Sequence, residues 1–131
     1  MRGIDTNVLV RYIVQDDPSQ AEAASAFVEE LSEHSTAIID LTVLIELVWV
    51  LSKAYGYSKK NIEQVIEQVL ITDCFIVEFS EIAWSALKEY KDGNADFSDY
   101  CIGISNLKNG ASHTVTFDQK AAKNELFTLL K

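Results

Sequence analysis

The residues of this chain best suited to chemistry are five carboxylates spread along its length. They are Asp5, Glu46, Asp96, Asp99 and Asp118. Asp5 and Asp118 each follow a short strand-like run, and Glu46 is the only charge in the apolar segment 41–51. Carboxylates that meet without enough Lys or Arg repel one another, and a hard divalent cation cancels this repulsion. The pattern therefore favours a magnesium or manganese site.

Each of these acids also has an ordinary structural explanation. An Asp at the end of a strand often caps the following helix, which applies to Asp5 and Asp118, and Asp96 stands where a helix cap is expected. An acid one turn into a helix, as expected for Asp99, gains from the helix dipole. One shared site explains all five positions together, whereas separate caps and ion pairs need a separate explanation for each acid.

Glu46 is the hardest of the five acids to explain structurally. Its helix looks apolar on nearly every side, so we expect the carboxylate to leave water. Burying an unpaired carboxylate is costly, or forces it to take up a proton. An ion pair with Arg2 or Arg11 is one solution, and a bound metal ion is the other.

The composition is that of one folded domain covering residues 1–131, with 48% hydrophobic residues, which excludes a disordered chain. The net charge of −9 argues against tight binding to bulk nucleic acid, although the five acids account for −5 of it and leave −4. Two distant cysteines, Cys74 and Cys101, form no CxxC motif and indicate buried thiols in a reducing, cytoplasmic setting. We expect no signal peptide and no membrane span, since the longest apolar run is short and contains Glu46.

Short β-branched runs alternate with helical patterns along the chain. Asp17 with Pro18 and Gln20 predicts a capping box at the second helix, Gly56 predicts a left-handed end to the third, and Ser58 predicts a cap on the fourth. We expect strands at 1–4, 36–39, 74–77, 113–117 and 127–130, and helices at about 6–14, 18–31, 41–55, 59–70, 81–92, 97–109 and 119–123.

Strands separated by helices predict an α/β fold with a parallel sheet and helices on both faces. Ligands of such sheets bind beyond the carboxyl ends of the strands. Asp5 and Asp118 stand at such ends, and the other three acids stand in the first turns of helices on the same side. We therefore expect the five acids to meet in one pocket.

Other candidate residues are weaker. His34 and His113 have no partners nearby in sequence, and the chain has neither a nucleophile elbow nor a Gly-rich phosphate loop. Two small basic clusters occur, Lys59–Lys60 and Lys120 with Lys123; such clusters are usually only solvated, but the second follows Asp118 and could contact a phosphate backbone. The apolar excess on helix 41–55 indicates core together with a subunit interface, at Leu44, Leu47, Val48, Trp49 and Leu51.

Four segments, in this order along the chain, resemble the sequence blocks of PIN-domain proteins, particularly the VapC-type toxins of prokaryotic toxin–antitoxin pairs. They are residues 4–12 (IDTNVLVRY), 44–51 (LIELVWVL), 95–103 (ADFSDYCIG) and 115–118 (VTFD). The blocks span nearly the whole chain. The third departs from the usual small-residue pattern at Tyr100 and Cys101, which we interpret as altered packing.

The resemblance implies a PIN-like three-layer α/β/α fold with a central parallel sheet of 4–5 strands. It also implies a Mg²⁺- or Mn²⁺-dependent endoribonuclease, a homodimer, and inhibition by a cognate antitoxin. By this resemblance Asp5, Asp99 and Asp118 are metal ligands and catalytic acids, Glu46 is the fourth catalytic acid, and Asp96 is an accessory acid. The polar residues Asn7 and Thr116 match supporting positions.

Rival functions fit less well. A haloacid-dehalogenase-type phosphatase requires Asp-x-Asp at the first strand, where this chain has Asn7 at the second position. A response-regulator receiver requires a phosphorylatable Asp after the third strand, which here ends Val77-Glu78-Phe79. The remaining alternative is a non-catalytic PIN-like scaffold that binds RNA or a protein, and the presence of every acid speaks against it.

Overall fold

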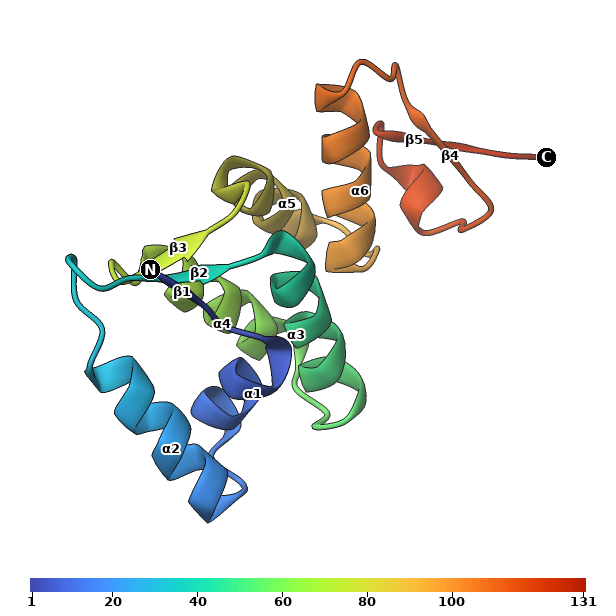
Figure 1. The fold of residues 1–131 in the computed structure, drawn as a ribbon. Helices are drawn as coiled ribbons and strands as arrows, with labels where there is room; N and C mark the ends of the chain where they lie inside the picture. Colours follow the sequence, from blue (N-terminus) through green and yellow to red (C-terminus); the bar gives the residue numbers. More distant parts are fainter. The chain divides into compact units, whose positions relative to one another are not determined.

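The computed structural model describes residues 1–131 (Figure 1). The chain forms two compact units, Met1–Ser80 and Glu81–Lys131, called unit 1 and unit 2 below. All five strands are paired in parallel, as predicted, and they form a three-stranded sheet in unit 1 and a two-stranded sheet in unit 2. None of the helices combines the length and apolar character needed to cross a membrane.

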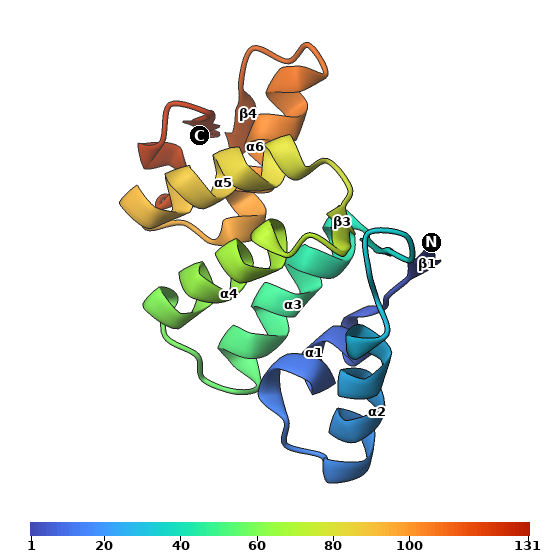
Figure 2. The ribbon, with the colours of Figure 1, turned by 90° about the vertical axis from the view of Figure 1, so that its left-hand side faces the viewer.

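Unit 1 is a parallel sheet in the order β1-β2-β3, with helices in each connection. Arg2 of β1 lies opposite Ala37 of β2, and Ile39 of β2 lies opposite Val77 of β3. In Figure 2, α3 and α4 run side by side, and the two helices are in contact. The elements are β1 (Arg2–Gly3), α1 (Thr6–Val14), α2 (Pro18–Glu29), β2 (Ala37–Ile39), α3 (Leu41–Lys53), α4 (Lys59–Ile71) and β3 (Phe75–Val77).

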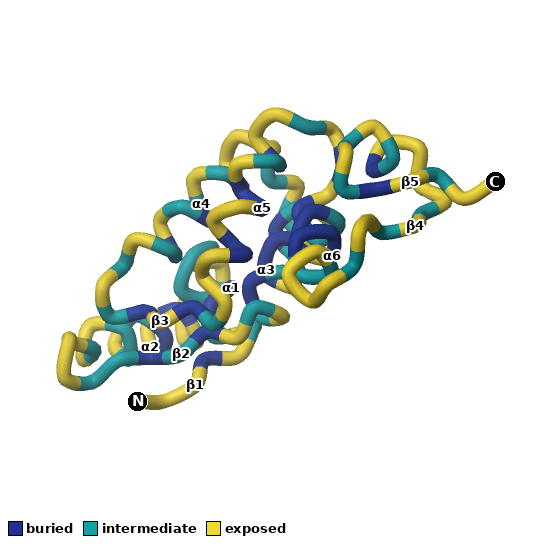
Figure 3. The backbone as a smooth tube through the Cα atoms, turned by 90° about the horizontal axis from the view of Figure 1, so that it is seen from above, coloured by how far each residue is buried: buried dark blue, intermediate teal, exposed yellow.

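Buried and more exposed residues alternate along strands β2 and β3 of unit 1, and this alternation determines which sheet face forms the core. Side chains of a strand point alternately to the two faces of a sheet. Phe75 and Val77 are buried while Ile76 between them is exposed, and Ala37 and Ile39 are buried around the half-buried Ile38. Figure 3 shows the buried stretches of β2 and β3, and those of α3. The core consists of this sheet face and the apolar faces of the helices.

Helix starts in unit 1 lie where the sequence predicted them. Ser58 caps α4 by accepting the N–H of Asn61, and Asp17 caps α2 by accepting the N–H of Gln20. The reverse half of the predicted capping box is wrong, because the Gln20 side chain accepts a hydrogen bond from Arg11 instead. Gly56 is left-handed, with φ of 66°, as predicted, but α3 already ends at Lys53.

The surface of helix α3 is less apolar than the sequence predicted. Four of its residues share a stripe that the structure leaves exposed, at the spacing i, i+4, i+7, i+11 of one helix face: Thr42, Glu46, Trp49 and Lys53. The expected surplus of apolar surface is therefore mostly core, since the other apolar residues named above are buried and only Trp49, 63% exposed, faces solvent.

Unit 2 packs two helices with a two-stranded parallel sheet, in which Thr114 lies opposite Phe127. Phe97, Tyr100 and Cys101 on one helix are fully buried. Burial raises the pKa of the Cys101 thiol to about 12, so it is an inert core residue, and both cysteines are free thiols. The elements are α5 (Ser80–Asp92), α6 (Phe97–Lys108), β4 (Thr114–Thr116), the 3-10 helix η1 (Ala121–Lys123) and β5 (Phe127–Leu129).

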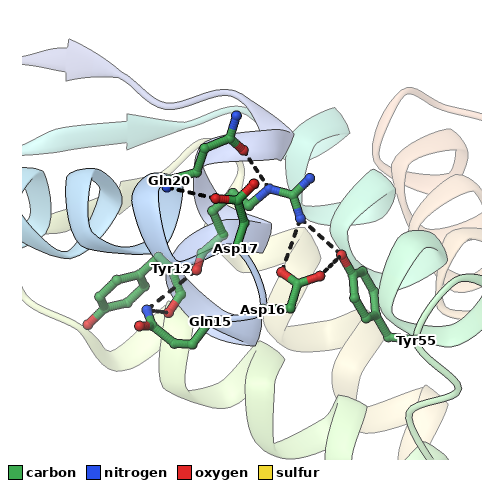
Figure 4. Close-up of polar contacts among 7 residues, drawn as sticks. Tyr12, Gln15, Asp16, Asp17, Gln20 and Tyr55 are labelled. Carbon is green, nitrogen blue, oxygen red and sulfur yellow. Dashed lines mark hydrogen bonds and ion pairs between the residues drawn. The ribbon is translucent and has the colours of Figure 1, made fainter.

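A polar cluster joins the turn between α1 and α2 to the end of α3 (Figure 4). Arg11 Nη1 donates to Asp16 Oδ1 at 3.1 Å and to the Tyr55 hydroxyl at 3.0 Å, and Tyr55 donates to Asp16 Oδ2 at 2.9 Å. Gln15, left-handed with φ of 62°, ends α1 and donates to the carbonyl of Tyr12 at 2.7 Å. The Arg11 guanidinium, the Asp16 carboxylate and the Tyr55 hydroxyl are thus each bonded to the other two. This triangle of hydrogen bonds holds the turn between α1 and α2.

Removing the Tyr55 hydroxyl should loosen this triangle in a pH-dependent way. The hydrogen bond from Tyr55 is the largest cause that lowers the pKa of Asp16. A lowered folded-state pKa contributes stability above the unfolded pKa that is lost as pH falls through the folded value. Tyr55→Phe should therefore lower the melting temperature at neutral pH, and the difference from the natural protein should shrink in acid.

Thermal unfolding across pH measures this effect. Tyr57→Phe is the control, because the Tyr57 hydroxyl makes no hydrogen bond in the structure. Equal losses for the two variants, or a loss for Tyr55→Phe that does not change with pH, would contradict the explanation.

Candidate active site

In unit 1, acids follow all three strands at the same edge of the sheet. Asp5 comes two residues after β1, Asp40 one residue after β2, and Glu78 one residue after β3. Continuing the register of the strands places the three residues side by side, with neighbouring backbones about 4.8 Å apart. Asp40 and Glu78 were not among the predicted acids, although each follows a strand in the same way as Asp5 and Asp118. The carboxyl edge of this sheet is therefore acidic, with two acids that were not predicted.

Asp5 is both a helix cap and a wall of a cavity. One of its oxygens, Oδ1, accepts the N–H of Val8 at 3.1 Å at the start of α1, and the residue is exposed. The adjoining cavity, of about 420 Å³, is also lined by Asn7 and Arg11, and its apolar part includes Phe27. Because the cap uses Oδ1, Oδ2 of Asp5 remains available to a ligand.

Glu46 is exposed on α3, which makes the expectation of a buried carboxylate wrong. The helix is less apolar than its sequence suggested, because Glu46 shares its exposed stripe with Thr42. The ion pair considered for Glu46 is absent as well, since Arg11 pairs with Asp16 and Arg2 lies over the Phe27 ring, 4.6 Å from its centroid. Glu46 therefore has neither a burial cost nor a cationic partner to explain it.

In unit 2, Asp96 and Asp99 form a capping box at the start of α6. Asp99 Oδ2 accepts the backbone N–H of Asp96 at 3.3 Å. Asp99 is half-buried while Asp96 is exposed. Burial, and then the nearby charges of Asp96 and Asp118, raise the pKa of the Asp99 carboxyl, although the hydrogen bond from Asp96 opposes the shift. Two of the other predicted acids, Asp96 and Asp118, are thus near enough for their charges to act on Asp99, although burial has the larger effect.

Asp118 is held at the end of β4. Its Oδ1 accepts the N–H groups of Lys120 at 2.8 Å and Ala121 at 3.3 Å, so it caps η1. The hydroxyl of Thr116 accepts the N–H of Asp118 at 3.0 Å. This contact fits the supporting role expected of Thr116, since it fixes the backbone of the acid rather than its carboxylate.

A polar cavity of about 220 Å³ in unit 2 contains both predicted lysines. Lys120 and Lys123 line it together with Asn94 and Asn124. Neither lysine forms a salt bridge, although Glu89 lines the same cavity and accepts a hydrogen bond from Asn124 at 3.0 Å. The cavity therefore offers two ammonium groups that form no salt bridge, two and five residues after Asp118 in the sequence, beside the carboxylates of Glu89 and Asp92.

The donor set suits a hard cation such as Mg²⁺ or Mn²⁺, because every candidate ligand is a carboxylate. No three His, Cys, Asp or Glu side chains are grouped closely enough to hold a metal ion by themselves. What the structure provides is a half-buried Asp99 carboxyl whose pKa is raised first by burial and then by the charges of Asp96 and Asp118, and a cation beside it would stabilise its charged form. Convergence of Asp5 and Glu46 with Asp99 and Asp118 stays a prediction of the sequence.

Replacing Asp99 with Asn should raise the melting temperature of the metal-free protein at neutral pH. The raised pKa of Asp99 means that its proton is held more tightly in the folded state than in the unfolded chain. Stability is then complete below the unfolded pKa and is lost as pH rises through the folded pKa. Because Asn resembles the protonated acid, its stabilising effect should disappear in acid.

Thermal unfolding in EDTA, from acid to neutral pH, tests this prediction. Glu125→Gln, at an exposed position of the same unit, is the control for loss of one negative charge. A lower melting temperature for Asp99→Asn than for the natural protein at neutral pH would show that the acid is not under repulsion.

Comparison with known proteins identifies the family of this chain. The sequence profile of the family described as PIN domain matches residues 4–125. The chain is 28% identical to a VapC ribonuclease of Aquifex aeolicus (strain VF5) over 124 residues, which covers 94% of this chain and 91% of that protein. No solved structure matches. The match extends from the residue before Asp5 to beyond Asp118, and the chain therefore belongs to the PIN domain family and has its α/β fold.

Proposed function

We propose that this protein is a Mg²⁺- or Mn²⁺-dependent endoribonuclease and the toxin of a VapBC-type toxin–antitoxin system. The observation that carries the proposal is the match of the PIN domain profile to residues 4–125, a range that holds all five candidate acids. The half-buried Asp99 adds to it, because burial first, and then the charges of Asp96 and Asp118, raise the pKa of its carboxyl. Similarity to a VapC ribonuclease over 94% of the chain supports the choice of substrate. The proposal treats residues 1–131 as one PIN domain.

In the proposed site, Asp5, Asp99 and Asp118 are metal ligands, and Glu46 is the fourth catalytic acid. That these acids act together rests on the order of the four sequence blocks. The caps support the ligand roles, because Asp5 and Asp118 each bond the backbone through Oδ1 and leave Oδ2 available. Asp96 is accessory, and Asn7 and Thr116 support the site.

Hydrolysis of an RNA phosphodiester needs a water that loses a proton near neutral pH and a stabilised leaving oxygen. A bound divalent cation supplies both effects. Glu46 is exposed and unpaired, so it can accept the proton of the attacking water. Lys120 and Lys123 would hold a phosphate of the substrate, since both line the polar cavity and neither ammonium group forms a salt bridge.

The proposal includes a cytoplasmic setting, a cognate antitoxin and a homodimer. Trp49, 63% exposed on α3, supports an interface there, because large exposed aromatic residues are enriched where proteins meet. The alternative is a PIN-like scaffold that binds RNA or protein without cleaving it. Expression of the chain alone should arrest growth, whereas harmless expression together with no RNA cleavage would favour the scaffold.

Asp5→Asn, Asp99→Asn and Asp118→Asn should each nearly abolish RNA cleavage in Mg²⁺ or Mn²⁺ while leaving the fold intact. Asn still accepts the capping N–H bond but loses the charge needed to bind metal. Because ligands of one site act as a unit, a double variant should be little worse than a single one. Cleavage assays with folded protein, verified by thermal unfolding, measure this.

Asp96→Ala is the contrasting variant. If Asp96 is mainly a cap, it should retain more activity and lose about 1 kcal/mol of stability. Loss of activity as complete as that of Asp99→Asn would overturn the ranking of the two acids.

The lysine pair should contribute to the salt dependence of RNA binding. In an Asp99→Asn background that does not cleave, replacing Lys120 and Lys123 with Gln should weaken binding. It should also reduce the slope of log affinity against log salt by about 0.7 for each lost phosphate contact on single-stranded RNA.

Fluorescence anisotropy over a range of salt concentrations gives both quantities. The pair Lys59→Gln/Lys60→Gln removes the same charge from unit 1 and is the matched control. Equal effects of the two pairs would mean that Lys120 and Lys123 act only through net charge.

A further inference from the structure

Tyr100 is a polar residue in the core of unit 2, immediately after Asp99. It is 1% exposed, so its hydroxyl must find partners inside the protein. That hydroxyl accepts the buried N–H of Ala95 at 3.2 Å. Ala95 directly precedes Asp96, so Tyr100 bonds to the backbone at the far side of the capping box.

The backbone entering α6 is therefore held by two consecutive side chains. The N–H of Ala95 donates to Tyr100, and the next N–H, that of Asp96, donates to Asp99 Oδ2. A peptide plane that is fixed at residue 95 restricts the direction of the following N–H. The bond made by Tyr100 and the bond that orients the Asp99 carboxylate thus hold consecutive N–H groups of the same backbone segment.

The loop before α6 is shaped around the Tyr100 ring. A Cβ atom at Gly93 would overlap the Tyr100 hydroxyl and lie 2.9 Å from ring atom Cζ. The φ angle of Gly93 is outside the left-handed region, so space rather than backbone freedom requires glycine there. Gly93 provides the room that Tyr100 occupies, and Ala95 provides the donor.

We propose that Tyr100 is a positioning residue, which holds the Ala95–Asp96 backbone so that the Asp99 carboxylate is oriented toward the proposed divalent cation. The proposal rests on the proposed function for the metal-binding role of Asp99. It gives a role to one of the two residues, Tyr100 and Cys101, that depart from the family's small-residue pattern. Where the family pattern has a small side chain that only packs, Tyr100 forms one buried hydrogen bond.

Tyr100→Phe tests the proposal, because it keeps the ring and removes only the hydroxyl. Residues that orient metal ligands typically change metal affinity or activity about 10- to 100-fold when replaced. We expect Mn²⁺ affinity, measured by isothermal titration, to fall at least about 10-fold, kcat to fall with little change in KM, and the Ala95 amide to exchange hydrogen faster.

Ile104→Val is the matched control, since Ile104 is buried on the same helix and contacts neither the loop nor the acids through a hydrogen bond. It should lower the melting temperature while preserving Mn²⁺ affinity and kcat. Gly93→Ala disturbs the Tyr100 hydroxyl from the opposite side and should reproduce the loss of Mn²⁺ affinity, which keeps the test valid if Tyr100→Phe fails to fold.

The outcomes distinguish failure of the positioning role of Tyr100 from failure of the proposed nuclease function. Natural Mn²⁺ affinity and kcat in folded Tyr100→Phe, or equal losses in Ile104→Val, would overturn the positioning role while leaving the nuclease intact. Absence of RNA cleavage by the natural protein would instead overturn the nuclease, and weaker Mn²⁺ binding by Tyr100→Phe would still support the positioning role. Absence of Mn²⁺ binding by the natural protein would overturn the positioning role directly.

Discussion

The N–H groups at the start of a helix have no partner within the helix, and this requirement places most of the acids in the structure. Asp5 and Asp40 accept such groups at α1 and α3, and Asp118 accepts two at η1. Asp96 and Asp99 share the start of α6. Each acid is thereby fixed in position and lies in the positive field of a helix end. Capping and chemistry are consequently compatible roles for one side chain.

The short strands strengthen this arrangement. No strand exceeds three residues, and each of β1 to β4 leads within one or two residues to an acid at or near the start of the next helix or turn. With parallel pairing, the acids after β1, β2 and β3 are kept at one edge of the sheet. Backbone N–H groups stabilise two of these carboxylates, those of Asp5 and Asp40. In unit 2, burial raises the pKa of the Asp99 carboxyl even though that carboxyl accepts the N–H of Asp96.

Much of this architecture could be predicted from the sequence because it depends on local rules. Helix starts at Asp17, Ser58 and Asp96 follow from capping chemistry. The error at Gln20 arose because a distant Arg11 competed for its side chain. The exposure of Glu46 was not predicted because most residues of α3 are apolar and only a narrow stripe of this helix is exposed. The hydroxyl contact of Tyr100 could not be predicted, since it depends on the loop path between two helices.

The double role of the caps has a genetic consequence. An Asp codon becomes an Asn codon by a single transition, and Asn keeps the hydrogen bond that starts the helix while losing the charge. Under the proposed function, cells that escape poisoning by this protein would often carry such a change at Asp5 or Asp118. Selection would then recover full-length, folded and harmless chains rather than truncated ones. Those chains would still present an intact surface to an antitoxin and could sequester it from active copies.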